Sequence, residues 1–199
     1  MYFTLKWCKL LVNNDMKKLI LVNGDLAAGK SHFAIILKNR FNLPLLTKDE
    51  LKEQLAETNP YESYEESHKL SIIAMEMLFD FFKEHAKRGE DLILEANFRG
   101  PHFDELEKIN KDYGYQILDI DLVGSVEILH KRYVNRFFFE NRHAVHKAND
   151  LSEFEAFKKY TLSRRKERTI GEVLLINADD LSYQSDEKIF EKIREFLNK

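Results

Sequence analysis

The chain has little of what identifies several common classes of protein. It has one cysteine, Cys8, so an intrachain disulfide is excluded and a reducing compartment is favoured. It has no apolar run near the roughly 20 residues that a membrane-spanning helix requires. It has 7 glycines, 3 prolines and no repeat or low-complexity segment, so nothing indicates a flexible linker. We therefore expect one compact domain in the cytoplasm, with no membrane association.

The chain also has no large excess of positive or negative charge. The formal net charge of the 199 residues is −3, which does not favour binding to duplex nucleic acid through bulk positive charge. Hydrophobic residues make up 44% and charged residues 33% of the chain. This composition is typical of a globular protein rather than a disordered one.

Met16 is the expected boundary between a short N-terminal segment and the folded domain. The segment MKKLILVNGD, which begins at Met16, is a natural opening for a first strand. We therefore expect residues 1–15 to be an N-terminal extension and residues 16–199 to form the domain. A short ordered strand or tail is the alternative for residues 1–15, and neither interpretation places chemistry there.

Short apolar runs alternate with longer segments of helical periodicity, which is typical of a parallel sheet with crossover helices. The first run is apolar throughout, as expected for a strand that is covered on both faces. Strands are predicted at 19–22, 43–46, 91–95, 115–122 and 172–176. Helices are predicted at about 30–40, 49–57, 64–86, 130–136 and 186–197. The predicted fold is α/β, with three layers and a five-stranded parallel sheet.

The most specific pattern is a phosphate-binding loop. The segment Gly24–Ser31, GDLAAGKS, matches G-x-x-x-x-G-K-S, follows an apolar strand and opens a helix. Its glycines let main-chain N–H groups wrap a phosphate, and the helix directs its positive end there. Lys30 is expected to neutralise β- and γ-phosphate oxygens, and the Ser31 hydroxyl to ligate Mg²⁺. ATP and Mg²⁺ are the predicted cofactors, and the nucleotide is expected to contact Gly24, Leu26, Ala27, Ala28, Gly29, Lys30, Ser31, His32 and Arg132.

Two other branches of phosphate-loop proteins match less well. GTPases carry a guanine-reading N-K-x-D motif, which this chain lacks. Motor-type ATPases end their third strand in adjacent acids, whereas the third predicted strand ends here in one acid, Glu95, followed by Ala-Asn-Phe-Arg. Beside the phosphate loop, Glu95 would hold a magnesium-bound water or an acceptor hydroxyl. A local salt bridge is the alternative.

Three further segments follow the phosphate loop in order. They are LTKDELK around Asp49, LEANFR at 94–99, and the pattern Arg132-x-x-x-Arg136 followed by Asn-Arg-His at 141–143. With the loop, these segments resemble small P-loop kinases that phosphorylate a hydroxyl group. That group includes gluconate- and shikimate-type kinases, polynucleotide 5′-hydroxyl kinases and zeta-type toxins. The resemblance covers about 17–197, and it implies a nucleotide-kinase-like P-loop NTPase fold with a helical lid at about 125–168.

The resemblance implies an acceptor site around Asp49. In such kinases an acid after the second strand faces the acceptor hydroxyl, and it orients that hydroxyl or takes its proton. Asp49 matches this position, although an acid there also suits the N-terminus of a helix. Glu95, Asn97, Arg99 and Arg142 are also expected to bind substrate, and Arg99 is suited to a phosphate or carboxylate. An exposed loop arginine is the alternative for Arg99.

Arg132 and Arg136 are four residues apart, so both point to one face of a helix. Such a pair can reach over a nucleotide and stabilise charge on the transferring phosphoryl group. The resembled kinases supply such arginines from a mobile lid. We therefore expect Lys30, Asp49, Arg132 and Arg136 to be the catalytic residues, with a solvated helix face as the alternative for the two arginines.

Four other features are less specific. Phe137–Phe139 is expected to pack into the core, with a cover over the nucleotide as the alternative. His143 and His146 have no cysteine or acid at ligand spacing, so zinc is not expected. The basic stretch Lys158–Arg168 is expected to be a solvated helix, with a site for a polyanionic acceptor as the alternative. The loop at 177–180 is a candidate adenine site, through its main-chain groups.

The sequence thus predicts an ATP-dependent kinase that transfers the γ-phosphoryl group to a hydroxyl of a small molecule or of a nucleic-acid end. One alternative is an ATPase or nucleotide-dependent switch without a phosphoryl acceptor. Another is a zeta-toxin-like kinase of a nucleotide sugar. The expected partners are ATP and a hydroxyl-bearing substrate, and no pattern identifies the acceptor or the oligomeric state.

Overall fold

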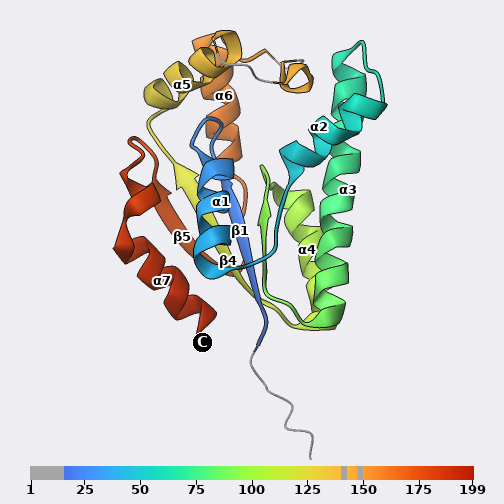
Figure 1. Ribbon diagram of the computed structural model, residues 1–199. Coiled ribbons are helices and arrows are strands. Elements are labelled where there is room, and N and C mark those ends of the chain that lie inside the picture. The colour runs from blue at the N-terminus through green and yellow to red at the C-terminus, as the bar shows by residue number, and fades with distance from the viewer. Residues whose placement is uncertain (1–15, 140–142, 148–149) are drawn as a thin grey trace, which may run out of the picture.

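A five-stranded parallel sheet forms the centre of the protein (Figure 1). The computed structural model describes residues 16–139, 143–147 and 150–199, so the predicted extension at 1–15 and the predicted substrate residue Arg142 lie outside the described residues. The strand order is β2-β3-β1-β4-β5. The strands are β1 (Lys18–Gly24), β2 (Leu45–Thr47), β3 (Leu92–Glu95), β4 (Gln116–Val123) and β5 (Glu172–Asn177).

All neighbouring strands pair in parallel, so their carboxyl ends meet at one edge, which is the upper edge in Figure 1. The central strand is β1, which is paired with β3 on one side and β4 on the other. Its apolar residues from Leu19 to Val22 are fully buried. The predicted α/β fold with a five-stranded parallel sheet is confirmed.

Helices cover both faces of the sheet (Figure 1). On one face, α1 (Lys30–Phe41) and α7 (Glu187–Leu197) contribute Phe33, Leu37, Phe190 and Ile193 to one buried cluster. On the other face, α3 (Tyr64–Arg88) and α4 (Gly100–Tyr113) contribute Leu78, Phe82, Phe103 and Leu106 to a second cluster. These two clusters and the sheet between them form the three predicted layers.

The remaining helical elements lie mostly at the carboxyl edge of the sheet (Figure 1). They are α2 (Lys48–Thr58), α5 (Val126–Phe138), the 3-10 turn η1 (Ala144–His146), α6 (Phe154–Arg164) and the 3-10 turn η2 (Ser182–Ser185). The predicted lid segment at 125–168 therefore forms α5, η1 and α6, above the phosphate loop. Among the described helices, none combines the length and apolar character that crossing a membrane requires.

Some predicted boundaries differ from the structure. β2 begins at Leu45 rather than at residue 43, because Pro44 has no N–H to donate and contributes only its carbonyl oxygen, which accepts from Ile93 N at 2.8 Å. Helix α4 was not predicted, although Phe103, Leu106 and Ile109 have helical spacing and are buried.

The apolar residues of α3 predict the helix but not its buried face. Leu70 and Phe82 are buried, whereas Ile73 and Met77 are 42% and 41% exposed. The helix begins at a capping box, in which Ser63 Oγ accepts from Glu66 N and the Glu66 carboxylate accepts from Ser63 N. Local chemistry therefore fixes where α3 starts, and packing on the sheet selects which stripe is buried.

Phe33 of α1 packs against Tyr183 of η2 and Phe190 of α7 in the first cluster, and its removal is expected to destabilise the fold. The side chain is fully buried, and its ring centre lies 5.2 Å from that of Tyr183 and 6.1 Å from that of Phe190. Phe33→Ala should lower the free energy of unfolding by about 3–5 kcal/mol, because it leaves a cavity. Ile35→Ala is the matched control on the same helix, since Ile35 is 42% exposed, and it should cost about 0.5 kcal/mol. Urea denaturation measures both, and equal losses would contradict the assignment.

Candidate functional site

The phosphate loop joins β1 to α1 at the upper edge of the sheet (Figure 1). Its backbone has positive φ at Gly24 (134°), Ala27 (60°) and Gly29 (91°). A Cβ atom at Gly24 would lie 2.3 Å from the Leu122 carbonyl oxygen, so only glycine fits where the loop passes β4. The loop therefore has the tight concave turn in which main-chain N–H groups converge on an anion.

Three predicted residues meet beside this loop. Lys30 is 8% exposed, and its Nζ donates to the carbonyl oxygens of Gly24 (3.2 Å) and Asp25 (2.8 Å). Ser31 Oγ donates to Glu95 Oε2 at 3.2 Å. Glu95 is the last residue of β3 and is 3% exposed. The structure thus places a cation, a hydroxyl and a carboxylate together at the mouth of the loop.

Burial governs the protonation of Lys30 and Glu95. Each group loses hydration when charged, so burial lowers the pKa of Lys30 and raises the pKa of Glu95. The attraction between the two charges offsets part of both shifts. A triphosphate in the loop would add negative charge next to Lys30, and it would favour the charged form of that side chain.

Tyr183 supports the phosphate loop through a contact that no sequence pattern predicts. Its hydroxyl donates to the Ala28 carbonyl oxygen at 2.7 Å, and the side chain is 3% exposed. A Cβ atom at Gly29 would lie 2.5 Å from the same hydroxyl, so the tyrosine and the glycine fit each other. Tyr183 lies in η2, so the turn after β5 helps to shape the phosphate loop.

Asp49 lies in the first turn of α2, but it is not the helix cap. Thr47 is the N-cap, and its hydroxyl accepts from the α2 main chain. Asp49 Oδ1 contacts Lys48 Nζ at 2.9 Å, and 38% of the Asp49 side chain is exposed. Burial opposes ionisation, but Lys48, His146 and Lys30 outweigh it and hold the pKa of Asp49 well below its usual range. Asp49 is therefore ionised at neutral pH.

Two cavities meet at Asp49. The first, which we call the loop cavity, has a volume of about 680 Å³ and follows the phosphate loop. The second, which we call the polar cavity, has a volume of about 360 Å³ and lies toward α2 and α3. The lining of the loop cavity includes Lys30, Ser31, His32, Glu95, Arg132, Arg136, Leu181 and Gln184. Both cavities are lined by Leu26, Asp49, Asn97 and Tyr133.

The polar cavity carries an excess of positive charge. Its charged lining residues are the cations Lys48, Lys52 and Arg99 and the acid Asp49. Its hydroxyl-bearing residues are Tyr64, Ser67, Ser71, Tyr133 and Tyr160. This lining suits a polar molecule that has hydroxyl groups and negative charge.

Arg99 is part of this cavity rather than an exposed loop residue. It is the N-cap residue of α4, its guanidinium lies 4.8 Å from the ring centre of Tyr160, and its Nη1 lies 3.4 Å from Glu167 Oε1. Tyr160 belongs to α6, so the loop after β3 and the helix α6 are held together at one wall of the polar cavity.

The turn η1 closes another side of the polar cavity. The Val145 carbonyl oxygen accepts from Lys52 Nζ (3.2 Å) and from Ser67 Oγ (2.9 Å). His146 Nε2 lies 2.8 Å from Glu53 Oε1. These contacts hold η1 on α2 and α3, and Val145 is fully buried.

The two predicted arginines of α5 line the loop cavity, but Arg132 has a role that was not predicted. Its Nη1 and Nη2 donate at 2.6 Å to the carbonyl oxygens of Ala178 and Asp179. Arg132 therefore fixes the loop after β5, which is the candidate adenine site. Leu181 and Gln184 follow that loop and line the loop cavity.

The expectation that Phe137–Phe139 packs into the core is wrong for two of its three residues. Phe137 is partly buried and packs against the first cluster. Phe138 and Phe139 are 57% and 81% exposed. The last turn of α5 is at the surface, so only one of the three aromatic side chains can face inward.

Asp25 and its partners form a charged cluster that no sequence pattern predicts. Asp25 is fully buried in the phosphate loop, and its carboxylate accepts from Arg164 and Arg165. Arg164 Nη1 also donates to Asp121 Oδ1 at 2.9 Å. The stretch Lys158–Arg168 is therefore not simply a solvated helix: α6 ends at Arg164, which is 5% exposed.

Comparisons with known proteins agree with this geometry at the level of the fold. No protein-family model and no curated protein matches the chain. A protein from Chloroflexus aurantiacus, provisionally described as a kinase, has a TM-score of 0.79 at 22% identity, over 91% of this chain and 98% of that one. Shikimate kinase from Bacteroides thetaiotaomicron has a TM-score of 0.56 at 17% identity, over 92% and 99%. A gluconokinase from Sinorhizobium meliloti has a TM-score of 0.57 at 10% identity, over 92% and 94%.

These identities are all below 25%, so the similarity establishes the fold. The sheet order β2-β3-β1-β4-β5 with a phosphate loop after β1 is that of the nucleotide and shikimate kinases. The predicted nucleotide-kinase-like fold is thereby confirmed.

Asp119 of β4 is a further buried acid close to the Asp25 cluster, and it makes stability depend on pH. Burial, and then the neighbouring Asp121 carboxylate, raise the pKa of Asp119 to about 7 from an ordinary value of 3.8. Between these values the folded protein binds a proton that the unfolded chain has released. Stability from this group is therefore complete below about pH 4 and is lost as the pH rises through about 7.

Asp119→Asn should remove this dependence, because the amide stays neutral. The free energy of unfolding of the variant, relative to that of the unmodified protein, should increase between about pH 4 and pH 7 in urea denaturation. Asp112→Asn is the control, since Asp112 is an exposed acid on α4. Parallel pH profiles for the Asp119→Asn variant and the unmodified protein would show that the pKa of Asp119 is not raised by folding.

Proposed function

We propose that the protein is an ATP-dependent kinase that transfers the γ-phosphoryl group of ATP to a hydroxyl group of a small molecule. The observation that carries this proposal is that the loop cavity and the polar cavity meet at Asp49. The first contains a phosphate loop, and the second has the size and polarity for a small acceptor. A plain ATPase needs the first cavity but has no use for the second.

The loop cavity supplies what phosphoryl transfer requires on the donor side. Main-chain N–H groups at the start of α1 would bind phosphate oxygens, and Lys30 would neutralise the β- and γ-phosphates. Arg132 and Arg136 line the same cavity from α5 and would stabilise charge on the transferring group. The adenine base would lie near Leu181 and Gln184.

Ser31 and Glu95 fit a magnesium ion. The hydroxyl and carboxylate oxygens lie 3.2 Å apart next to the loop, and hard oxygen ligands of this kind suit Mg²⁺. Ser31 would hold the ion directly, and Glu95 would hold one of its water molecules. When bound, the ion neutralises charge on the phosphates.

Asp49 would orient the acceptor. Its low pKa keeps the side chain ionised, so a carboxylate oxygen accepts a hydrogen bond from the acceptor hydroxyl and directs that oxygen toward the loop cavity. In a loose transition state the acceptor oxygen gains bonding late, and its proton becomes acidic only then. Orientation therefore comes before proton transfer, and the Asp49 carboxylate would take the acceptor's proton as the new P–O bond forms and ADP leaves. Lys48, Lys52 and Arg99 would favour an acceptor with a carboxylate or phosphate group.

Residues 125–168 would act as the lid. In this segment α5 carries the two arginines of the loop cavity, and η1 contacts α2 and α3 beside the polar cavity. Movement of the segment would admit substrates, and its return would exclude water from the site.

A transfer screen tests the proposed reaction. The protein is incubated with γ-labelled ATP, Mg²⁺ and separate sets of sugars, hydroxy acids, nucleosides, antibiotics, nucleotide sugars and 5′-hydroxyl oligonucleotides. We expect a labelled small molecule, with anionic acceptors labelled fastest because of the charge of the polar cavity. ATP hydrolysis without a labelled acceptor in any set would contradict the kinase and favour an ATPase or switch.

Two variants then separate donor chemistry from acceptor chemistry. Lys30→Ala should abolish transfer, because the phosphates lose their buried cation. Asp49→Asn should lower the rate of transfer by about 10²–10⁴ and leave the affinity for ATP near normal. Glu50→Gln, in the same turn of α2 and exposed, is the control and should retain activity. Near-normal transfer by the Asp49→Asn variant would reject the role of Asp49.

A further inference from the structure

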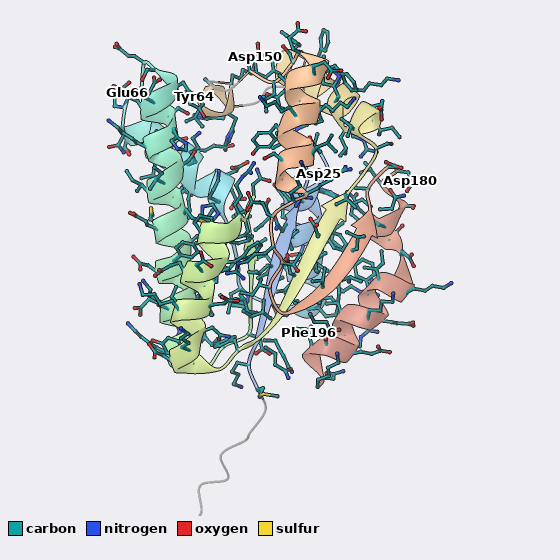
Figure 2. All side chains as sticks on the ribbon, turned by 180° about the vertical axis from the view of Figure 1, so that it is seen from behind. Asp25, Tyr64, Glu66, Asp150, Asp180 and Phe196 are labelled. Carbon is teal, nitrogen blue, oxygen red and sulfur yellow. The ribbon has the colours of Figure 1, made fainter. Side chains whose placement is uncertain are left out.

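The carboxylate of Asp25 connects the phosphate loop to the end of α6. Asp25 is fully buried, and Arg164 Nε donates to its Oδ1 at 2.9 Å. Arg165 donates to its Oδ2 through Nε at 3.0 Å and through Nη2 at 2.5 Å. Figure 2 shows Asp25 where the upper end of the sheet meets the lower end of α6. One loop carboxylate is thus held by two guanidinium groups from a single turn of chain.

The main chain of Asp25 helps to fix the shape of the loop. Its N–H donates to the Leu122 carbonyl oxygen at 2.8 Å. Its own carbonyl oxygen accepts from Lys30 Nζ at 2.8 Å and from Ala28 N at 3.3 Å. Asp25, whose side chain is held by the end of α6, therefore also accepts through its carbonyl oxygen from Lys30, the lysine that would neutralise the phosphates. A displaced Asp25 carboxylate would displace the carbonyl group on which Lys30 rests.

An acid in a phosphate loop needs compensation. An unpaired carboxylate at this position would repel a triphosphate, and its burial alone would be costly. Arg164 also binds Asp121, so two arginines face two acids and the cluster is close to neutral. The cluster thus allows an acid to remain in the loop without opposing an anionic ligand.

We propose that Arg164 and Arg165 are positioning residues, which hold the phosphate loop in its nucleotide-binding shape by binding the Asp25 carboxylate. The inference rests on the proposed binding of ATP at this loop. Neither arginine is among the described residues that line the loop cavity, so both act through Asp25 rather than on the phosphates. The segment from α6 also reaches the polar cavity, because Tyr160 contacts Arg99 there.

The test compares two arginines at the same end of α6. Arg165→Gln removes the contact to Asp25 and a second hydrogen bond to the Gly124 carbonyl oxygen after β4, and the 30% exposure of this side chain limits damage to the core. Arg168→Gln is the matched control, since Arg168 binds Asp104 and Glu107 on α4 and does not contact the loop. The dissociation constant of Mg-ADP is measured by calorimetry, and the unfolding midpoint is measured in urea.

We expect Arg165→Gln to weaken the binding of Mg-ADP by roughly 5-fold to 100-fold, in the range of coupling between contacting charged groups. Arg168→Gln should leave the dissociation constant unchanged, even if both variants lower the unfolding midpoint equally. Equal affinities for the two variants would overturn the inference, because Arg165 would then contribute to the stability of the fold and not to nucleotide binding. Absence of nucleotide binding by the unmodified protein would instead overturn the proposed function together with the inference.

A second variant separates positioning from general damage. Asp25→Asn weakens the same contact from its other side, so the double variant Asp25→Asn with Arg165→Gln should lose at least about threefold less affinity for Mg-ADP than the product of the two single losses. Arg165→Lys keeps the positive charge and should recover part of the affinity. Losses that simply multiply in the double variant would show that the two residues act independently, and they would overturn the proposal.

Discussion

Buried charge at the carboxyl edge of the sheet is the constraint on which the rest of the site depends. Asp25, Lys30, Glu95 and Arg164 are all buried there, with exposed fractions of 0%, 8%, 3% and 5%. Each buried ion costs several kcal/mol in hydration unless its partners replace the lost water. The partners come from β1, β3, β4, α1 and α6, so the site and the fold are held by the same contacts. In an edge built in this way the charged groups are held by protein partners before any phosphate binds, which is what electrostatic preorganisation requires.

The sequence predicted those parts of the structure that depend on local rules. The apolar run at 19–22, the glycine pattern of the loop and the periodicity of α3 each require a particular backbone, so their elements were located to within a few residues. The loop pattern also named Lys30 and Ser31, because phosphate binding restricts the residue types at those positions. Helix α4 is an exception, since no helix was predicted there although Phe103, Leu106 and Ile109 have helical spacing.

Contacts between distant segments could not be predicted in the same way. Asp25 occupies a position that the loop pattern leaves open, and Arg164 lies 139 residues later in a stretch whose basic composition indicated a solvated helix. Tyr183, which supports Ala28, lies 155 residues from its partner. The helical spacing of Arg132 and Arg136 placed both on one face, but it could not show that Arg132 would fix the loop after β5. Such pairs are specified by packing and leave no periodic pattern.

The polar cavity, where we propose that the acceptor binds, depends even more on contacts between distant segments. The polar cavity takes Lys52 from α2, Ser67 from α3, Arg99 from the start of α4 and Tyr160 from α6. Lys52 and Ser67 both donate to the carbonyl oxygen of Val145, so the groups available to an acceptor are also those that hold η1. The Lys52 ammonium group has three donors, so an anionic acceptor would share it with that carbonyl group. Under the proposed function, acceptor binding and the position of η1 would be linked through this one ammonium group, and by reciprocity whatever fixes η1 would also alter the affinity for the acceptor.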